Sequence, residues 1–337
     1  MARFLGGALL VLVAILAILL TWPQLVDLQN QWVFAHVVAL RGIAAVCGLG
    51  AALVVAAFLP IRRLRAFTAG LAGILVVFAA ANAGVLTVRG LGGSDAAPDG
   101  SITVLSWNTL GEVPGAEGIA ALALEQGADV VVLPETTEET SVEIAVAMRE
   151  AGRPMWVHHQ KFDDIAKARS TTLLISPELG VYDVVNADVP GPPGNTSTLP
   201  SVVAVPVDGV GPTIVAVHAV APIRWEFRNW RADLDWTADQ CASGNVIMAG
   251  DFNATLDHFA GRGVDGGDLG ICRDAALAAG AAGLGTWPTR LPEFLGSPID
   301  HVLATPEWHV DSFEVLDGLD DAGSDHRPVV ARLSPVG

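Results

Sequence analysis

Cysteine and basic residues are scarce in this sequence. Its 337 residues include three cysteines and 19 lysines and arginines, against 36 aspartates and glutamates. Three cysteines are too few for a disulfide-dense small protein or a cysteine-rich zinc module. The chain carries a net charge of −17, and because residues 1–93 carry +5, residues 94–337 carry −22. A domain that binds nucleic acid through a basic face needs clustered lysine and arginine, so this class of domain is excluded.

Apolar residues, by contrast, are abundant and are concentrated near the start of the chain. They make up 51% of the sequence, and residues 1–89 contain three long apolar runs, at about 5–22, 33–59 and 67–88. A helix of about 20 apolar residues crosses the hydrocarbon core of a bilayer. We therefore expect residues 1–89 to form an integral membrane region of three transmembrane helices.

The short loops predict the orientation of this region, because lysine and arginine are retained on the cytoplasmic side. The loop between the second and third runs contains Arg62, Arg63 and Arg65, whereas the loop between the first and second contains neither lysine nor arginine. We expect a multi-pass protein of the cell membrane with a cytoplasmic N-terminus. Everything after the third helix would then lie outside the cytoplasm.

A short linker is expected between the membrane region and the rest of the chain. Residues 90–100 are rich in glycine, alanine, aspartate and proline and have too little apolar content to fold. Fully extended, such a linker reaches at most about 40 Å. The domain at 101–337 is therefore held close to the bilayer. His36 and Arg41, near Trp32 in the second apolar run, are expected to lie at the outer membrane interface.

Residues 101–337 alternate short β-branched runs with alanine-rich helical stretches, which predicts an α/β or α+β sandwich. Polar residues recur where the expected strands end. Each of these residue types alone is common in turns. Together they supply hard oxygen ligands and imidazoles, which suit Mg²⁺ and phosphate chemistry. The strand-end motifs are SWN with Asn108, LPE with Glu135, VAVH with His218, GDFN with Asp251 and Asn253, PID with Asp300, and SDH with Asp325 and His326.

The order of these motifs resembles the endonuclease/exonuclease/phosphatase superfamily over about residues 101–334. The resemblance implies a four-layer α/β (α+β) sandwich, in which two mixed β-sheets are flanked by helices. Here the sandwich would be preceded by the three transmembrane helices. The resemblance also implies a metal-dependent phosphoric ester hydrolase with Mg²⁺ as its cofactor, or Mn²⁺ in its place.

The resemblance assigns a metal site and two weaker substrate contacts. Glu135 would be the principal metal ligand, with Asn108 beside it and Asp325 close to the metal. Arg169, before a later strand, is a candidate for holding a phosphate, with a plain surface position as the alternative. His301 stands where relatives often carry an aromatic residue, and it would either add a ligand or simply pack.

The resemblance also assigns the catalytic residues. Asp251 would orient and deprotonate the attacking water, and Asn253 would bind the phosphate and fix that water. His218 and His326 would donate hydrogen bonds to the phosphoryl oxygens as charge develops on them. Asp300 would support His326 through a carboxylate–imidazole hydrogen bond. An in-line displacement at phosphorus needs groups of these kinds.

These observations favour a membrane-anchored, extracytoplasmic, Mg²⁺-dependent phosphodiesterase. Three alternatives stay open: an extracellular nuclease acting on DNA or RNA, a phospholipase C-like lipid phosphodiesterase, and a catalytically silent, membrane-tethered binding module. The charge of −22 disfavours long nucleic acid, so we expect no stable nucleic-acid complex and a preference for short or small phosphoesters. No apolar hairpin suited to entering the bilayer is evident, which weakens the phospholipase alternative.

The three cysteines divide between the two parts of the chain. Cys47 lies inside the second apolar run, so an oxidising exterior leaves Cys241 and Cys272 to pair. We expect a disulfide between them, with two buried thiols as the alternative.

Overall fold

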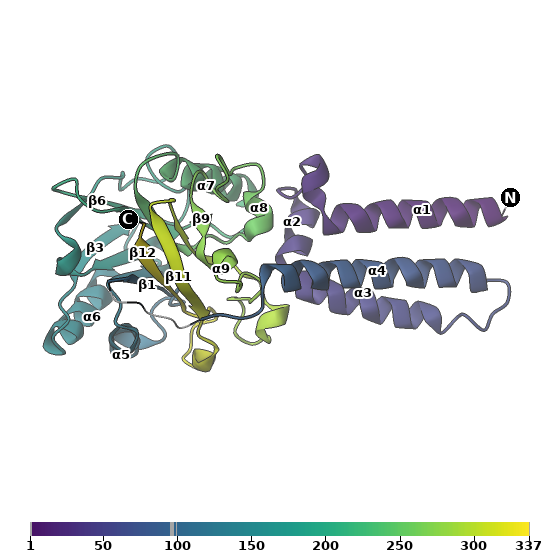
Figure 1. The fold of residues 1–337 in the computed structure, drawn as a ribbon, viewed down its shortest axis with the longest axis horizontal. Helices are drawn as coiled ribbons and strands as arrows, with labels where there is room; N and C mark the ends of the chain where they lie inside the picture. Colours follow the sequence, from purple (N-terminus) through teal and green to yellow (C-terminus); the bar gives the residue numbers. More distant parts are fainter. Residues whose placement is uncertain (1, 95–97, 99, 337) are drawn as a thin grey trace.

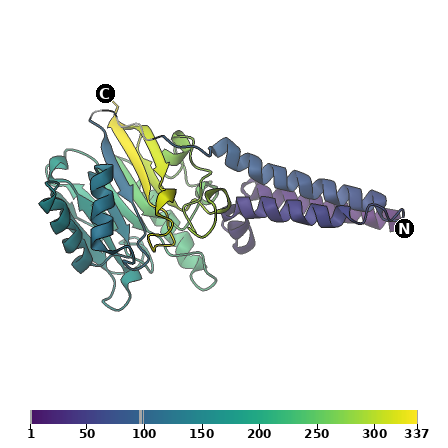
Figure 2. The same ribbon diagram turned by 90° about the horizontal axis from the view of Figure 1, so that it is seen from below.

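The computed structural model describes residues 2–94, 98 and 100–336. A bundle of apolar helices extends from one end of a β-sandwich, and the two parts meet through a short helix, α2 (Figures 1 and 2). The N-terminus lies at the end of the bundle that is far from the sandwich (Figure 1).

The sandwich consists of two six-stranded sheets. The first has the order β11 (Trp308–Val315), β12 (Val329–Pro335), β1 (Ile102–Ser106), β2 (Val130–Pro134), β4 (Ser170–Ile175) and β3 (Trp156–Lys161). The second has the order β5 (Tyr182–Val184), β6 (Val202–Pro206), β7 (Thr213–His218), β8 (Val246–Asp251), β10 (Asp300–Ala304) and β9 (Arg273–Asp274). Both sheets are mixed, because β1–β2 and β7–β8 are parallel and the other pairs are antiparallel.

Three apolar cores show that the sheets stack face to face with helices outside. Val104 packs in the core between the sheets, whereas the next residue, Leu105, packs under the outer helices of the first sheet. This alternation is the two-residue period of a strand, and because both faces are buried the strands read as continuous apolar runs. The outer helices are α5 (Gly115–Gln126) and α6 (Glu138–Glu150) on the first sheet and α7 (Phe227–Gln240) on the second. The predicted four-layer sandwich is confirmed.

Short helices connect the main elements. They are α8 (Leu256–Phe259) and α9 (Ala275–Ala278) and the 3-10 helices η1 (Pro23–Val26), η2 (Lys167–Arg169), η3 (Pro177–Leu179), η4 (Glu293–Leu295) and η5 (Asp317–Leu319).

The apolar helices match the predicted membrane spans except at the second one. The bundle contains α1 (Ala2–Thr21), α3 (Arg41–Ala56) and α4 (Arg65–Arg89), and α2 (Trp32–Ala39) precedes α3. Two helices, α1 and α4, are long and apolar enough to cross a membrane, and a third span exists if α2 and α3 count as one. However, α2 and α3 meet at 92°, so the expected continuous helix over 33–59 is wrong.

The break has a physical cause in the contact with the sandwich. Leu40 leaves the helical conformation. The side chain of Arg41, at the start of α3, is buried and binds Asp257 in α8. Meanwhile α2 lies on the sandwich, where the Ala35 carbonyl oxygen is 3.1 Å from Nε2 of His258. The uniform apolar character of this segment gives no sign of the bend.

Close backbone packing joins the bundle to the sandwich. A Cβ atom at Gly42, in the first turn of α3, would lie 2.0 Å from the carbonyl oxygen of Phe294 in η4. The start of the expected linker is bound to the sandwich. The amide of Gly92 donates to the Gly280 carbonyl oxygen, and the amide of Ser94 donates to the Phe313 carbonyl oxygen. The helices therefore contact the domain directly.

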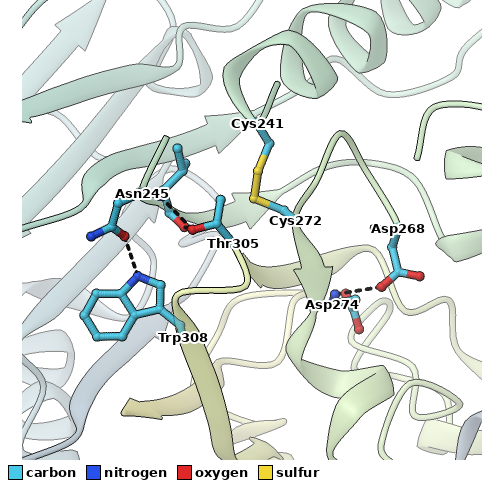
Figure 3. Close-up of a disulfide and its surroundings, with 8 residues drawn as sticks. Cys241, Asn245, Asp268, Cys272, Asp274, Thr305 and Trp308 are labelled. Carbon is cyan, nitrogen blue, oxygen red and sulfur yellow. Dashed lines mark hydrogen bonds between the residues drawn. A yellow bond between two sulfur atoms is a disulfide. The ribbon is translucent and has the colours of Figure 1, made fainter. Parts of the chain in front are cut away.

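Figure 3 shows that Cys241 and Cys272 form a disulfide. Cys241 follows α7 and Cys272 precedes β9, so the bond ties the outer helix layer to the edge of the second sheet. Nearby, the Asp268 carboxylate accepts a hydrogen bond from the Asp274 amide at 2.9 Å and anchors the same loop. Cys47 in α3 is unpaired.

Candidate active site

The strand-end residues of both sheets meet at one edge of the sandwich. In the second sheet the register places His218 beside Asp251, and Asp251 beside Asp300. The first sheet contributes Asn108 just after β1 and Glu135 just after β2. Because β1 and β2 are parallel, as are β7 and β8, their carboxyl ends lie together and bring these side chains to one place.

The amide of Asn108 links the two sheets across the site. Its Nδ2 donates to Oδ2 of Asp251 at 3.0 Å and lies 3.4 Å from Oε1 of Glu135. Its Oδ1 accepts the Leu110 amide at 3.0 Å. Asn108 thus holds two carboxylates next to each other, whereas like charges would otherwise push them apart.

Two site residues have a left-handed backbone conformation. Glu135 has φ of 64° and Asn253 has φ of 47°. Asparagine visits this region readily, but a glutamate there is uncommon and costs on the order of 1–3 kcal/mol. The strain places the Glu135 carboxylate in the site, where burial raises its pKa despite the hydrogen bond from Asn108.

Asp251 is buried and its orientation is fixed by three hydrogen bonds. Oδ1 accepts the Asn253 amide at 2.8 Å, and Oδ2 accepts Nδ2 of Asn253 at 3.1 Å as well as the Asn108 amide group. Asn253 also donates to the Ala219 carbonyl oxygen at 2.9 Å. The backbone and both amides therefore hold the Asp251 carboxylate rigidly.

His326 forms an imidazole–carboxylate pair with Asp300. Nδ1 of His326 lies 2.9 Å from Oδ2 of Asp300, and its other nitrogen, Nε2, lies 3.8 Å from Oδ2 of Asp251. Burial would lower the pKa of His326, but the carboxylates of Asp300 and Asp251 outweigh it and raise that pKa. His326 is therefore a cation at neutral pH whose free N–H faces Asp251. Burial raises the pKa of Asp251, and the charge on His326 opposes that effect.

His218 is a neutral imidazole in the same site. It is 1% exposed, and burial followed by the charge of His326 lowers its pKa to about 3. Its Nδ1 lies 3.3 Å from Oγ1 of Thr171. The site thus pairs one charged imidazole with one neutral imidazole.

Sequence reasoning missed several residues that support the site. Nε1 of Trp287 donates to Oδ2 of Asp325 at 2.9 Å, which holds that half-exposed carboxylate 4.0 Å from Nε2 of His326. Trp107 donates from its indole nitrogen to the His326 carbonyl oxygen at 2.9 Å. Thr171 lies beside His218. Trp287 lies outside the strand-end motifs. Trp107 lies within SWN, but nothing in that motif assigns a role to the tryptophan.

The donor set fits a divalent cation. Four carboxylates, from Glu135, Asp251, Asp300 and Asp325, gather around one charged imidazole, and no lysine or arginine in the described part of the chain forms an ion pair with any of them. Oδ1 of Asp300 is buried without a hydrogen-bond partner among the described residues. Such an excess of hard oxygen ligands suits Mg²⁺ or Mn²⁺.

Two groups of residues could hold the cation. Asp251, Asp300 and His326 place one ligand atom each within 4.8 Å of one another. However, Nδ1 of His326 is already committed to Asp300, and a ligating imidazole must give up the proton that its carboxylate neighbours stabilise. Glu135 and Asp325 lie close enough together for the charge of Asp325 to raise the pKa of Glu135. As carboxylates, they can bind a cation without losing a proton that the site stabilises. We therefore favour the side of the site formed by Glu135, Asp325 and Asn108.

The structure takes His301 away from the site. Its Nδ1 lies 2.6 Å from Oδ2 of Asp274, and its Nε2 lies 2.9 Å from the Ala254 carbonyl oxygen. Successive residues of a strand point to opposite faces, so His301 cannot share the direction of Asp300. Of the two options expected for His301, packing is the one that the structure supports.

Arg169 is also engaged elsewhere. Its Nε pairs with Oδ2 of Asp163 at 3.0 Å, and its guanidinium lies over the Phe162 ring at 6.0 Å. Its charge is therefore partly offset within its own loop, and the structure gives it no contact with the described residues at the strand ends.

Comparisons with known proteins agree with this fold. A search among curated proteins found no match. A structure from Beutenbergia cavernae described as an endonuclease/exonuclease/phosphatase is similar, at 19% identity over 70% of this chain and 72% of that one, with a TM-score of 0.52. TDP2 of D. rerio complexed with a single-strand DNA product is 17% identical over 70% of this chain and 100% of that one, with a TM-score of 0.53.

The mannosyl-6-phosphatase Bt3783 of Bacteroides thetaiotaomicron is 17% identical over 69% of this chain and 99% of that one, with a TM-score of 0.50. At these identities the likeness concerns the fold. The model of the Endonuclease/Exonuclease/phosphatase family, however, matches residues 105–326, which is more than half of the chain and includes all the strand-end motifs. The chain therefore belongs to the endonuclease/exonuclease/phosphatase family, whose members are metal-dependent phosphoester hydrolases.

Proposed function

We propose that this protein is a membrane-anchored, Mg²⁺-dependent phosphodiesterase that acts outside the cytoplasm. The observation that carries the proposal is the pair formed by Asp251 and the His326–Asp300 dyad, with 3.8 Å between Nε2 of His326 and Oδ2 of Asp251. A fixed carboxylate then faces a charged N–H donor in a site rich in uncompensated acids. Phosphoester hydrolysis needs this arrangement of base and donor.

Each residue has a step that its contacts suit. Asp251, held by Asn108 and Asn253, takes the proton of the attacking water. Both N–H groups of the Asn253 side chain are used by Asp251 and the Ala219 carbonyl oxygen, so Asn253 fixes the base, and its Oδ1 can accept a hydrogen bond from the water. His326, charged and held by Asp300, donates to an oxygen whose negative charge grows in the transition state. A divalent cation bound at Glu135 and Asp325 would act as a Lewis acid on the phosphoryl oxygens.

The charge of the site supports a diester substrate. A diester carries one negative charge at neutral pH and a monoester up to two, and each must be offset by donors in the site. Besides a bound cation, the described site offers the charged imidazole of His326 and the neutral imidazole of His218, and the nearby Arg169 is already paired with Asp163. We expect so few donors beyond the cation to suit the monoanion better than the dianion.

The arrangement of arginines supports the orientation. Arg41 and Arg89 lie at the end of the bundle that meets the sandwich, and both are ion-paired with Asp257. Arg62 and Arg63 lie at the opposite end, in the loop between α3 and α4, where they are exposed. The cations without a carboxylate partner are thus at the far end, which the positive-inside rule assigns to the cytoplasm.

Hydrolysis by the full-length chain in detergent tests the proposal. We expect bis(4-nitrophenyl) phosphate to be hydrolysed with Mg²⁺, to be stable in excess EDTA, and to be cleaved faster than 4-nitrophenyl phosphate. Glu135→Gln should require a higher Mg²⁺ concentration for half-maximal rate. Full activity in EDTA would contradict the metal dependence, and a faster monoester would contradict the diester assignment.

A further inference from the structure

A cavity of about 250 Å³ lies between the bundle and the active site. Asn253, from the loop that follows β8, forms part of its wall, and so does Trp287, which binds the Asp325 carboxylate. The opposite wall belongs to the membrane region, through Ala35, Ala39 and Leu40. The cavity therefore connects residues of the catalytic site with the helix that precedes the membrane span.

The wall of the cavity is mostly apolar. Ala221, Pro222, Ile223 and Ile299 line it on the side of the sandwich, and no aspartate, glutamate, lysine or arginine is among the described residues that form it. His36 and Ser297 add two polar side chains: Nδ1 of His36 is used by the Trp32 carbonyl oxygen at 2.7 Å, and the buried Ser297 hydroxyl has no partner among the described residues. His258 also lines it, but burial lowers its pKa to about 4 and its Nε2 is used by the Ala35 carbonyl oxygen. A polar or charged group would lose more hydrogen bonds to water here than it could regain.

The two walls are held together firmly. Asp257 lies four residues after Asn253, and it binds both Arg41 and Arg89 at 2.7 Å. At the other end of α2, the rings of Trp32 and Phe227 are 5.3 Å apart in an edge-on arrangement. The cavity is therefore a built feature of the fold and not a loose gap between two parts.

An apolar rim leads from the cavity to the surface. Ile223 belongs both to the wall and to an exposed loop before α7 in which Trp225 is 78% exposed. Trp32 of α2 is also exposed near the same junction. Exposed tryptophans at this level suit the membrane–water interface. The loop therefore exposes Trp225 and Ile223 beside the junction with the bundle, with the exposed Arg224 between them, which the sequence did not make evident.

We infer that this cavity holds the hydrocarbon segment next to the phosphate of a lipid phosphodiester drawn from the adjoining membrane leaflet. The inference rests on the proposed function, because the phosphate must reach Asn253 and His326 while the chain enters between α2 and Ile223. Pockets that enclose a whole small ligand usually measure about 300–1,000 Å³. At about 250 Å³ this cavity would hold only the chain carbons nearest the phosphate, and the rest of the chain would stay in the bilayer.

Chain-length dependence of hydrolysis tests this inference. We would measure kcat/KM of the full-length protein with 4-nitrophenyl ethyl, hexyl and dodecyl phosphates, which differ only in the alkyl group. In wild type, kcat/KM should rise by up to about fourfold for each methylene that enters the cavity and then level off. Ala39→Phe, which fills the cavity, should bring the hexyl-to-ethyl ratio close to one.

Val33→Phe is the matched control, because Val33 lies on the same helix, is exposed and does not line the cavity. It should keep the wild-type ratio. If wild type hydrolyses the ethyl diester but shows no chain-length dependence, the inference fails and the proposed function stands. If Ala39→Phe and Val33→Phe both keep the wild-type ratio, the chain binds elsewhere and the inference also fails.

A photoreactive analogue tests the cavity without hydrolysis. A dodecyl phosphodiester with a diazirine close to the phosphate should label residues 221–223 in wild type and in Val33→Phe, and should not label them in Ala39→Phe. Labelling at this place in a protein that hydrolyses none of the diesters would refute the proposed function alone. Labelling only at other places would overturn the inference.

Discussion

Arg41 and Asp257 form a buried, two-pronged ion pair across the junction of the bundle and the sandwich. Nε and Nη2 of Arg41 lie 2.9 and 2.7 Å from Oδ2 and Oδ1 of Asp257, and both side chains are 1% exposed. Arg89 of α4 adds a second cation at 2.7 Å from Oδ2. The segment after β8, which carries Asn253 and Asp257, is therefore coupled to two helices of the bundle through one carboxylate.

Asp257→Asn should destabilise the full-length protein by about 3–5 kcal/mol, because it leaves buried Arg41 without its countercharge. Thermal unfolding in detergent measures the change. Asp235→Asn is the control, since Asp235 pairs with Arg262 at the surface and such pairs contribute about 0–1 kcal/mol. Equal effects of the two substitutions would contradict the role of the junction.

The same carboxylate predicts a pH dependence. Burial would raise the pKa of Asp257, but the hydrogen bonds and charges of Arg41 and Arg89 hold it well below the ordinary value of 3.8. A depressed folded-state pKa contributes stability that is present above about pH 4 and is lost as the pH falls below it. Wild type should therefore lose a growing part of its advantage over Asp257→Asn as the pH falls from about 4 to about 2. A constant difference over that range would show that the ionised carboxylate is not what stabilises the junction.

The disulfide gives a separate prediction about stability. Cys241 and Cys272 enclose a loop of about 30 residues. Reducing the bond should therefore lower the free energy of unfolding by roughly 3–4 kcal/mol in the chain-entropy model. Thiol labelling of the unfolded, unreduced chain should modify Cys47 alone. Labelling of all three cysteines would mean that the bond is absent in the protein as produced.

Topology can be measured independently of activity. With the sandwich outside the cytoplasm, protease added to intact cells with a permeable outer layer should remove it. If the sandwich is protected until the membrane is breached, the sandwich lies in the cytoplasm and the loop with Arg62 and Arg63 lies outside, contrary to our proposal.

The sequence was enough to predict most of the sandwich and the strand-end residues that meet at its edge. Strands buried on both faces appear as apolar runs, and polar residues directly after them, such as Glu135 and Asp251, stand out. The motif order then indicated the family. His301 follows Asp300 directly, so the alternation of a strand already turns it away once Asp300 is assigned to the site. Its partner Asp274 is 27 residues away, and no local pattern indicates that pairing.

The junction could not be predicted for a different reason. Arg41 and Asp257 are 216 residues apart, and no local pattern couples an arginine in an apolar run to a carboxylate in a distant loop. The bend between α2 and α3 depends on that contact, as does the cavity beside Asn253. Trp287 was missed similarly, because its role is a single long-range hydrogen bond to Asp325.

The dyad of His326 and Asp300 is the centre of the proposed chemistry, and a second histidine–aspartate pair provides a matched control. Asp300→Asn removes the carboxylate 2.9 Å from Nδ1 of His326, and Asp274→Asn removes the carboxylate 2.6 Å from Nδ1 of His301, which lies outside the site. Both changes alter a buried pair in the same sheet. Only the first acts on His326, the histidine proposed to donate to the phosphate.

The most direct measurement is kcat for hydrolysis of bis(4-nitrophenyl) phosphate with saturating Mg²⁺, corrected for the folded fraction of each variant. Asp300→Asn should lower kcat by about 10²-fold or more, because the transition-state donor His326 then loses the carboxylate that holds its charged, donating form. Asp274→Asn should lower stability but leave kcat of the folded protein within about twofold of wild type. Equal kcat values for wild type and Asp300→Asn would contradict the account.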